Sequence, residues 1–180
     1  MFNILKQFNA GGDIVGRDKI THNILPPRTQ LDMLNELYRE EVENNVQTKQ
    51  LIEELQHYSN INPTNRDLES KLRSAGFEYI ICEAEELKEL VAKLIVKHQN
   101  YQSAQQIITF LLSKVESNFN TRIKPSLHNI NDENTLRIII QDDLVNLITQ
   151  QLGYNVLYIF DRQVKGMMFF LTGNCHLEWQ

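Results

Sequence analysis

The apolar residues of this chain recur at the spacing of an α-helix along most of its length, and this period constrains the fold more than any other feature. Between about Leu31 and Leu171, leucine, isoleucine and valine return every three or four residues in successive segments. Because an α-helix has about 3.6 residues per turn, this spacing places the apolar residues of each segment on one face. The pattern predicts a mainly α fold, a bundle of about six helices with short connections.

Capping and breaking residues divide the pattern into helices. Thr29 followed by Asp32 resembles a capping box and predicts that the first helix begins there. Its apolar stripe is narrow and continues to about Tyr58, which predicts a helix that packs on one side only. Further helix stops are expected at Gly76, Pro125 and Gly153.

The first 27 residues lack the helical period. They hold three of the seven glycines and two of the four prolines. Ile20 and Ile24 fall on one face of an extended chain, and Gly16 can adopt the positive φ of a tight turn. We therefore predict a short β-hairpin-like unit over residues 1–27, closed by two adjacent prolines, and a helical domain over residues 28–180.

A two-stranded unit of this size is marginally stable by itself in water, and its edges carry unpaired backbone groups. Pairing with the same segment of other copies satisfies both demands, so we expect the unit to drive self-association into a homo-oligomer. A trimer is preferred over a dimer because three strand pairs can enclose a small apolar axis. The residues expected to carry this contact are Gly12, Asp13, Ile14, Val15, Gly16, Arg17, Asp18 and Ile20.

Composition and charge limit the classes of function. Lys and Arg number 18 against 23 Asp and Glu, a formal net charge of −5, which disfavours direct nucleic-acid binding. Two cysteines exclude a disulfide framework and a four-thiolate zinc site. Since no segment is apolar enough for a bilayer span, we expect a cytoplasmic protein with no membrane partner. The basic residues closest to a nucleic-acid-binding stripe are expected to be solvated helix residues: Arg66, Lys71, Arg73, Arg122 and Lys124.

Known catalytic and phosphate-binding motifs are missing from the sequence. The glycines near Gly12 and Gly16 lack the Lys-Ser/Thr and the helix that complete a P-loop. The histidines and cysteines show no metal-ligand spacing, and only Cys175 and His176 are adjacent. We expect no enzymatic activity, cofactor or metal. The alternatives are an enzyme with an unrecognised site, such as a nuclease or nucleotide hydrolase, and a nucleic-acid-binding module.

Residues 166–179 form the densest apolar stretch of the chain. One interpretation is a final helix and tail that complete the core. The other is a surface that faces a partner, since methionine and aromatic residues are enriched at interfaces. The residues that would serve in either role are Gly166, Met167, Met168, Phe170, Gly173, Asn174, Cys175, His176 and Trp179.

Two parts of the sequence resemble bacterial conflict-system proteins. The segment GGDIVGRDKI resembles a short glycine-turned motif at the start of many such proteins. From about Leu31 to Gln180 the chain resembles the C-terminal domain of ABC-three-component (Lamassu-like) anti-phage systems. The matching segments are SAGFEYIICEAEELKELVAKLI, YQSAQQIITFLLSKVESNFNTRIKP and, most specifically, VKGMMFFLTGNCHLEW.

This resemblance implies an oligomerising component that binds partners, working beside an SMC-like ABC ATPase and a middle component. In many members the domain follows an effector such as a nuclease or protease. The first 30 residues are too short for an enzymatic domain, so any effector is expected in another polypeptide. The resemblance therefore predicts a non-enzymatic scaffold or adaptor of a bacterial anti-phage system.

Overall fold

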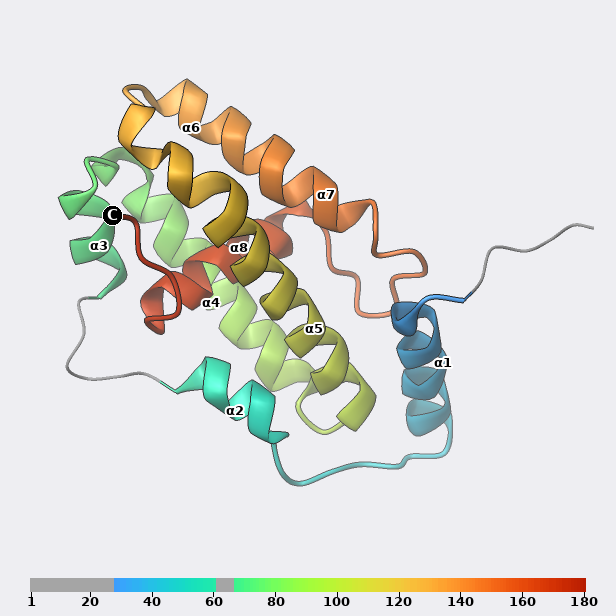
Figure 1. Ribbon diagram of the computed structural model, residues 1–180. Coiled ribbons are helices and arrows are strands. Elements are labelled where there is room, and N and C mark those ends of the chain that lie inside the picture. Colours follow the sequence, from blue (N-terminus) through green and yellow to red (C-terminus); the bar gives the residue numbers. More distant parts are fainter. Residues whose placement is uncertain (1–27, 61–66) are drawn as a thin grey trace, which may run out of the picture.

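Helices make up all of the regular structure in residues 28–60 and 67–180, the parts of the chain that the computed structural model describes (Figure 1). The prediction of a mainly helical fold is confirmed. The β unit predicted over residues 1–27, with the contact residues from Gly12 to Ile20, lies outside the described residues. Among the described helices, none combines the length and apolar composition needed to cross a bilayer.

Eight α-helices follow one another along the described chain. They are α1 (Gln30–Glu43), α2 (Glu53–Ser59), α3 (Leu68–Ser74), α4 (Ile81–His98), α5 (Gln102–Asn118), α6 (Glu133–Ile140), α7 (Asn146–Thr149) and α8 (Asp161–Gly173). Short 3-10 helices cover Glu78–Ile80 and Lys124–Asn129, and π turns cover Phe119–Ile123 and Gln141–Val145.

The first helix begins where its capping box predicts. The Asp32 backbone N–H donates to Thr29 Oγ1 at 3.1 Å, and the Thr29 N–H donates to Asp32 Oδ2 at 2.9 Å. Two N–H groups that lack a partner inside the helix are thereby satisfied. The hydrogen bonds from Thr29 also hold the pKa of Asp32 below its ordinary value.

The stripe that predicts one helix as far as Tyr58 is divided between α1 and α2. Asn45 follows α1 with a φ of +51°, the left-handed conformation that ends helices. The Val46 N–H donates to Glu41 O and the Asn45 N–H donates to Val42 O, which is the Schellman pattern. The prediction of one continuous helix is wrong because asparagine provides here the stop that glycine usually provides.

α8 crosses α4 at the centre of the molecule, and α5 packs against both (Figure 1). The residues of α8 from Gly166 to Gly173 are buried on every side. Gly166 lies against the α4 backbone, since a Cβ at this position would stand 2.6 Å from Leu87 O and 2.9 Å from Val91 Cγ2. The absence of a side chain at Gly166 therefore permits the close crossing on which the core is built.

Polar contacts fasten α1 and the segment after it to the start of α5. The N-cap of α5 makes no side-chain hydrogen bond of its own, and Glu41 of α1 supplies one, accepting from Ser103 Oγ at 2.6 Å and Ser103 N at 3.2 Å. The fully buried Gln105 accepts from Ile52 N at 2.6 Å and donates to Gln50 O at 3.1 Å. A carboxylate at a helix N-terminus also complements the helix dipole.

Replacement of Gly166 by alanine is expected to lower the free energy of unfolding by about 1–3 kcal/mol, because the new methyl group would collide with the α4 backbone. Urea denaturation followed by circular dichroism measures the loss. Gly173→Ala is the matched control on the same helix. A Cβ there would meet only the flexible side chain of Lys88, and we expect little loss or a small gain. Equal losses for the two variants would contradict the close crossing.

Candidate functional site

The C-terminal residues singled out by the sequence lie mostly inside the folded chain. Buried side chains or backbone are found at Gly166, Met167, Met168, Phe170, Gly173, Asn174 and Trp179. Cys175 and His176, after the end of α8, are half-buried. In this fold the segment contributes chiefly to the core, and it reaches the surface at its Cys-His pair.

Trp179 closes the core beside three phenylalanines. Its side chain is 2% exposed, and its ring centroid lies 5.7 Å from that of Phe77, 5.2 Å from Phe119 and 6.3 Å from Phe169. The indole N–H donates to Thr172 Oγ1 at 3.0 Å. The aromatic contacts and the satisfied N–H together allow this large amphipathic side chain to be buried.

Lys71 of α3 binds the end of α8 from the other side. It is 2% exposed, and its Nζ donates to Thr172 O at 3.2 Å and to Leu177 O at 3.0 Å. Glu178 pairs with the same Nζ at 2.7 Å. A cation is favourable at the C-terminal end of a helix, where backbone carbonyls lack partners. The interpretation of Lys71 as a solvated helix residue is wrong, because its ammonium group replaces water at these carbonyls.

Two histidines that are far apart in the sequence meet at the surface. The ring centroids of His57 in α2 and His176 are 4.9 Å apart, and Tyr58 lies 5.1 Å from His176. Burial first and then the nearby His57 hold the pKa of His176 below its ordinary value. The effect of His57 on this pKa is the repulsion that a positive charge on its ring would exert on an imidazolium ion at His176.

Tyr58 joins this pair to α5. Its hydroxyl donates to Glu116 Oε2 at 2.9 Å, and burial followed by this carboxylate raises the pKa of Tyr58 to about 12. Asn174 Nδ2 donates to the backbone oxygen of Tyr58 at 2.9 Å. Across residues 28–60 and 67–180, no group of three or more His, Cys, Asp or Glu side chains is arranged to hold a metal ion. These contacts hold α2 beside α5 and the end of α8.

A second group of charges ties α4, α6 and α8 together. Glu83 accepts from Arg137 at 2.6 Å and from Lys165 at 3.0 Å. Burial opposes ionisation of Glu83, but the hydrogen bonds from Arg137 and Lys165 outweigh it and hold its pKa below the ordinary value. These contacts join three helices and have a structural role.

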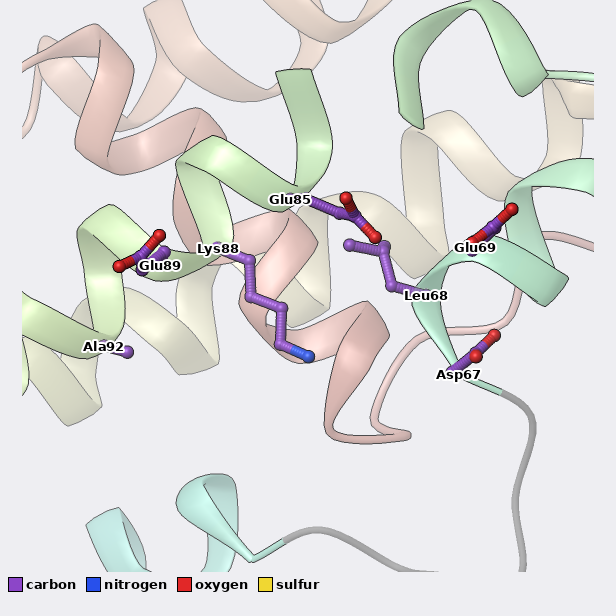
Figure 2. A pocket seen from close by; sticks show the side chains of 7 residues that line it. All are labelled: Asp67, Leu68, Glu69, Glu85, Lys88, Glu89 and Ala92. Carbon is purple, nitrogen blue, oxygen red and sulfur yellow. The ribbon is translucent and has the colours of Figure 1, made fainter. Parts of the chain in front are cut away.

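A groove of about 380 Å³ lies between the start of α3 and the exposed side of α4 (Figure 2). Its lining residues are Asp67, Leu68, Glu69, Glu85, Lys88, Glu89 and Ala92. Figure 2 shows the Lys88 side chain extending from α4, with carboxylates on both helices around it. The excess of negative charge favours a cationic ligand over an anionic one, but the cluster has the composition of an ordinary charged helix surface.

The surface that the sequence analysis missed is aromatic. Tyr154, Tyr158 and Phe160, between α7 and α8, are 57%, 70% and 59% exposed. The guanidinium carbon of Arg39 in α1 lies 4.0 Å above the Tyr154 ring centroid. In the sequence these rings are part of a long uncharged run, and their alternation with the buried Leu157 and Ile159 is the signal that could have revealed them.

Comparison with known proteins identifies one family. The family model described as C-terminal domain 9 of the ABC-three component (ABC-3C) systems matches residues 67–179. No curated protein and no solved structure matches the chain. The matched range covers α3 to α8 and includes the Cys-His-Leu-Glu-Trp ending, whereas α1 and α2 precede it. The resemblance of the N-terminal GGDIVGRDKI segment receives no support from the match.

Truncation of Trp179 to alanine is expected to lower the free energy of unfolding by about 3–5 kcal/mol, because it leaves a cavity among three phenylalanines. Urea denaturation followed by circular dichroism measures the change. Val96→Ala is a suitable control, since Val96 is 62% exposed and its truncation should cost little. A Trp179→Ala protein as stable as the control would contradict the burial of the ring.

The stability of the protein is expected to fall on acidification from about pH 7 to about pH 5.5. Burial holds the pKa of both His98 and His176 below the ordinary value of 6.5, so the unfolded state binds more protons in this window. Unfolding is then favoured as the pH falls. His176→Gln should reduce the pH dependence of the unfolding free energy, measured by urea denaturation at each pH. The exposed His128 provides the control His128→Gln, and an equal effect of both changes would contradict the prediction.

Proposed function

Since the chain belongs to the family of C-terminal domain 9 of the ABC-three component (ABC-3C) systems, we propose that it is a non-enzymatic scaffold or adaptor of such a system. The family match is the observation that carries this proposal. It covers the helices α3 to α8, which contain the crossing of α4 and α8 and most of the core. A domain that belongs to a system of several components works together with the other components.

The internal contacts of the matched domain support an adaptor. Lys71, Thr172 and Glu83 each bind partners on other parts of the fold and join helices to one another. Such contacts hold the helices together, and the folded domain can present surfaces to other proteins. The exposed aromatic residues near Tyr158 are of the type that is enriched at protein interfaces.

The proposed partners are an SMC-like ABC ATPase and a middle component, in a bacterial anti-phage system. Self-association through residues 1–27 is the second part of the proposal, because the apolar and turn-forming residues there fit pairing between copies.

Co-expression tests the adaptor role. The tagged full chain is produced together with the ATPase and the middle component of its proposed system. It should retain both in a fixed ratio through affinity and size-exclusion chromatography. Light scattering then gives the number of copies of each subunit. A tagged helical protein of similar size and charge, produced with the same subunits, is the control.

Two results would count against the proposal. Absence of both subunits from the purified chain would contradict the adaptor role. The chain alone is also assayed with DNA, RNA and nucleotides in the presence of divalent metals. Turnover that is abolished by substitution of a carboxylate cluster would contradict the non-enzymatic nature of the chain.

A further inference from the structure

The chain between α7 and α8 presents its aromatic rings on a fixed backbone. The alternation of side chains sends Leu157 and Ile159 into the core and leaves Tyr158 and Phe160 outside. The side-chain amide of Asn155 makes two hydrogen bonds with the backbone of Ile159, and we call this pair the Asn155 clamp. Its Nδ2 donates to Ile159 O, and its Oδ1 accepts from Ile159 N at 2.9 Å. We call residues 154–160 the aromatic loop.

Tyr158 occupies an unfavourable backbone conformation. Its φ is +55°, in the left-handed region that bulky residues rarely adopt, at a typical cost of order 1–3 kcal/mol. The Asn155 clamp and the two buried neighbours hold this conformation. The result is an exposed tyrosine, 70% accessible, on a backbone whose conformation is already set before any partner arrives. A partner that binds there does not have to order this backbone, which lowers the entropic cost of binding.

α1 forms the other side of the same surface (Figure 1). A groove of about 430 Å³ lies between α1 and the aromatic loop, with Arg39, Val42, Glu43, Tyr154 and Tyr158 among its lining residues. Arg39 lies over the Tyr154 ring, so one ring of the loop already holds a guanidinium group. Within the described residues, the rings of Tyr158 and Phe160 have no comparable cationic or aromatic contact.

The charge of α1 favours a basic ligand. The helix carries five acidic residues against one arginine. Glu41 is engaged with Ser103 and Glu36 with Arg28. Glu40 and Glu43 are exposed, and Glu43 lines the groove, where Arg39 is already held over Tyr154. Carboxylates beside aromatic rings attract guanidinium and ammonium groups and repel phosphates. A nucleic acid that stacked its bases on the loop would place its backbone against this negative helix.

The geometry points to the aromatic loop and the acidic side of α1 as a docking surface for a basic, arginine-bearing segment of a partner protein. Its arginines would lie over Tyr158 and Phe160, as Arg39 lies over Tyr154, and would pair with Glu40 and Glu43. This inference rests on the proposed function, because it names the surface through which the adaptor binds. The aromatic loop lies inside the family match, and α1 lies before it.

A defined peptide tests the surface without the natural partner. The probe is a labelled helical alanine peptide with arginine at every fourth position, compared with versions that carry lysine or glutamate there. The full chain should bind the arginine version most tightly. The double variant Tyr158→Ser and Phe160→Ser should weaken this binding about tenfold. Glu40→Gln with Glu43→Gln should weaken it and reduce its salt dependence.

Matched control variants distinguish peptide binding at this surface from nonspecific binding to other exposed apolar or acidic side chains. Val96→Ser with Ile138→Ser removes two other exposed apolar side chains, which are 62% and 51% accessible. Glu85→Gln with Glu89→Gln removes two carboxylates from the groove of Figure 2. Both controls should bind the peptide like the unchanged chain. Circular dichroism and the thermal midpoint verify that every variant is folded. Equal peptide binding by the aromatic variant and its control overturns the inference.

The co-expressed subunits distinguish the failure of this inference from that of the proposed function. If the unchanged chain retains the subunits and the aromatic variant loses them, the surface is the docking site. Retention by both overturns the inference and leaves the adaptor role intact. If the unchanged chain retains neither subunit, the adaptor role fails. The peptide assay then decides by itself whether the surface binds a basic segment. The same aromatic variant is tested for self-association by sedimentation and for binding to single-stranded DNA or RNA. If either property requires Tyr158 and Phe160, the surface has another occupant and the inference is overturned.

Discussion

The close contact between the backbones of α8 and α4 is the constraint on which the rest of the structure depends. Gly166 brings the buried face of α8 against Leu87 and Val91, and this places the following turns of α8 in the centre of the core. The end of α8 is thereby positioned to accept hydrogen bonds from Lys71 and to bring Trp179 among the phenylalanines. The family match ends at Trp179. The crossing of α4 and α8 and the aromatic contacts of Trp179 therefore both belong to the matched domain.

The sequence predicts the helical architecture well because the apolar period and the capping residues act locally. The start of α1 at Thr29 and the turn at Gly76 after α3 follow from side chains within a few positions of the helix end. The stop at Asn45 was missed because asparagine adopts the left-handed conformation less often than glycine, and its presence in a polar stretch gives no distinctive signal.

Contacts between distant segments could not be predicted in this way. The approach of His57 to His176 depends on how α2 packs beside the end of α8, which no spacing in the sequence records. Lys71 has the pattern of a surface residue, and only the fold shows that it lies under the C-terminal carbonyls. The aromatic loop was overlooked since apolar residues in an uncharged run suggest burial, whereas the Asn155 clamp turns two of the rings outward.

The chain contains a single tryptophan, and its position has a spectroscopic consequence. Because Trp179 is enclosed by aromatic rings while its N–H is bound to Thr172, its fluorescence emission reports the integrity of the central core. The aromatic residues of the aromatic loop are tyrosine and phenylalanine, so the loop contains no tryptophan. A molecule bound at the loop thus leaves the tryptophan emission at short wavelength, whereas release of the C-terminal tail moves it toward the red. One optical signal can therefore separate occupation of the outer surface from opening of the interior.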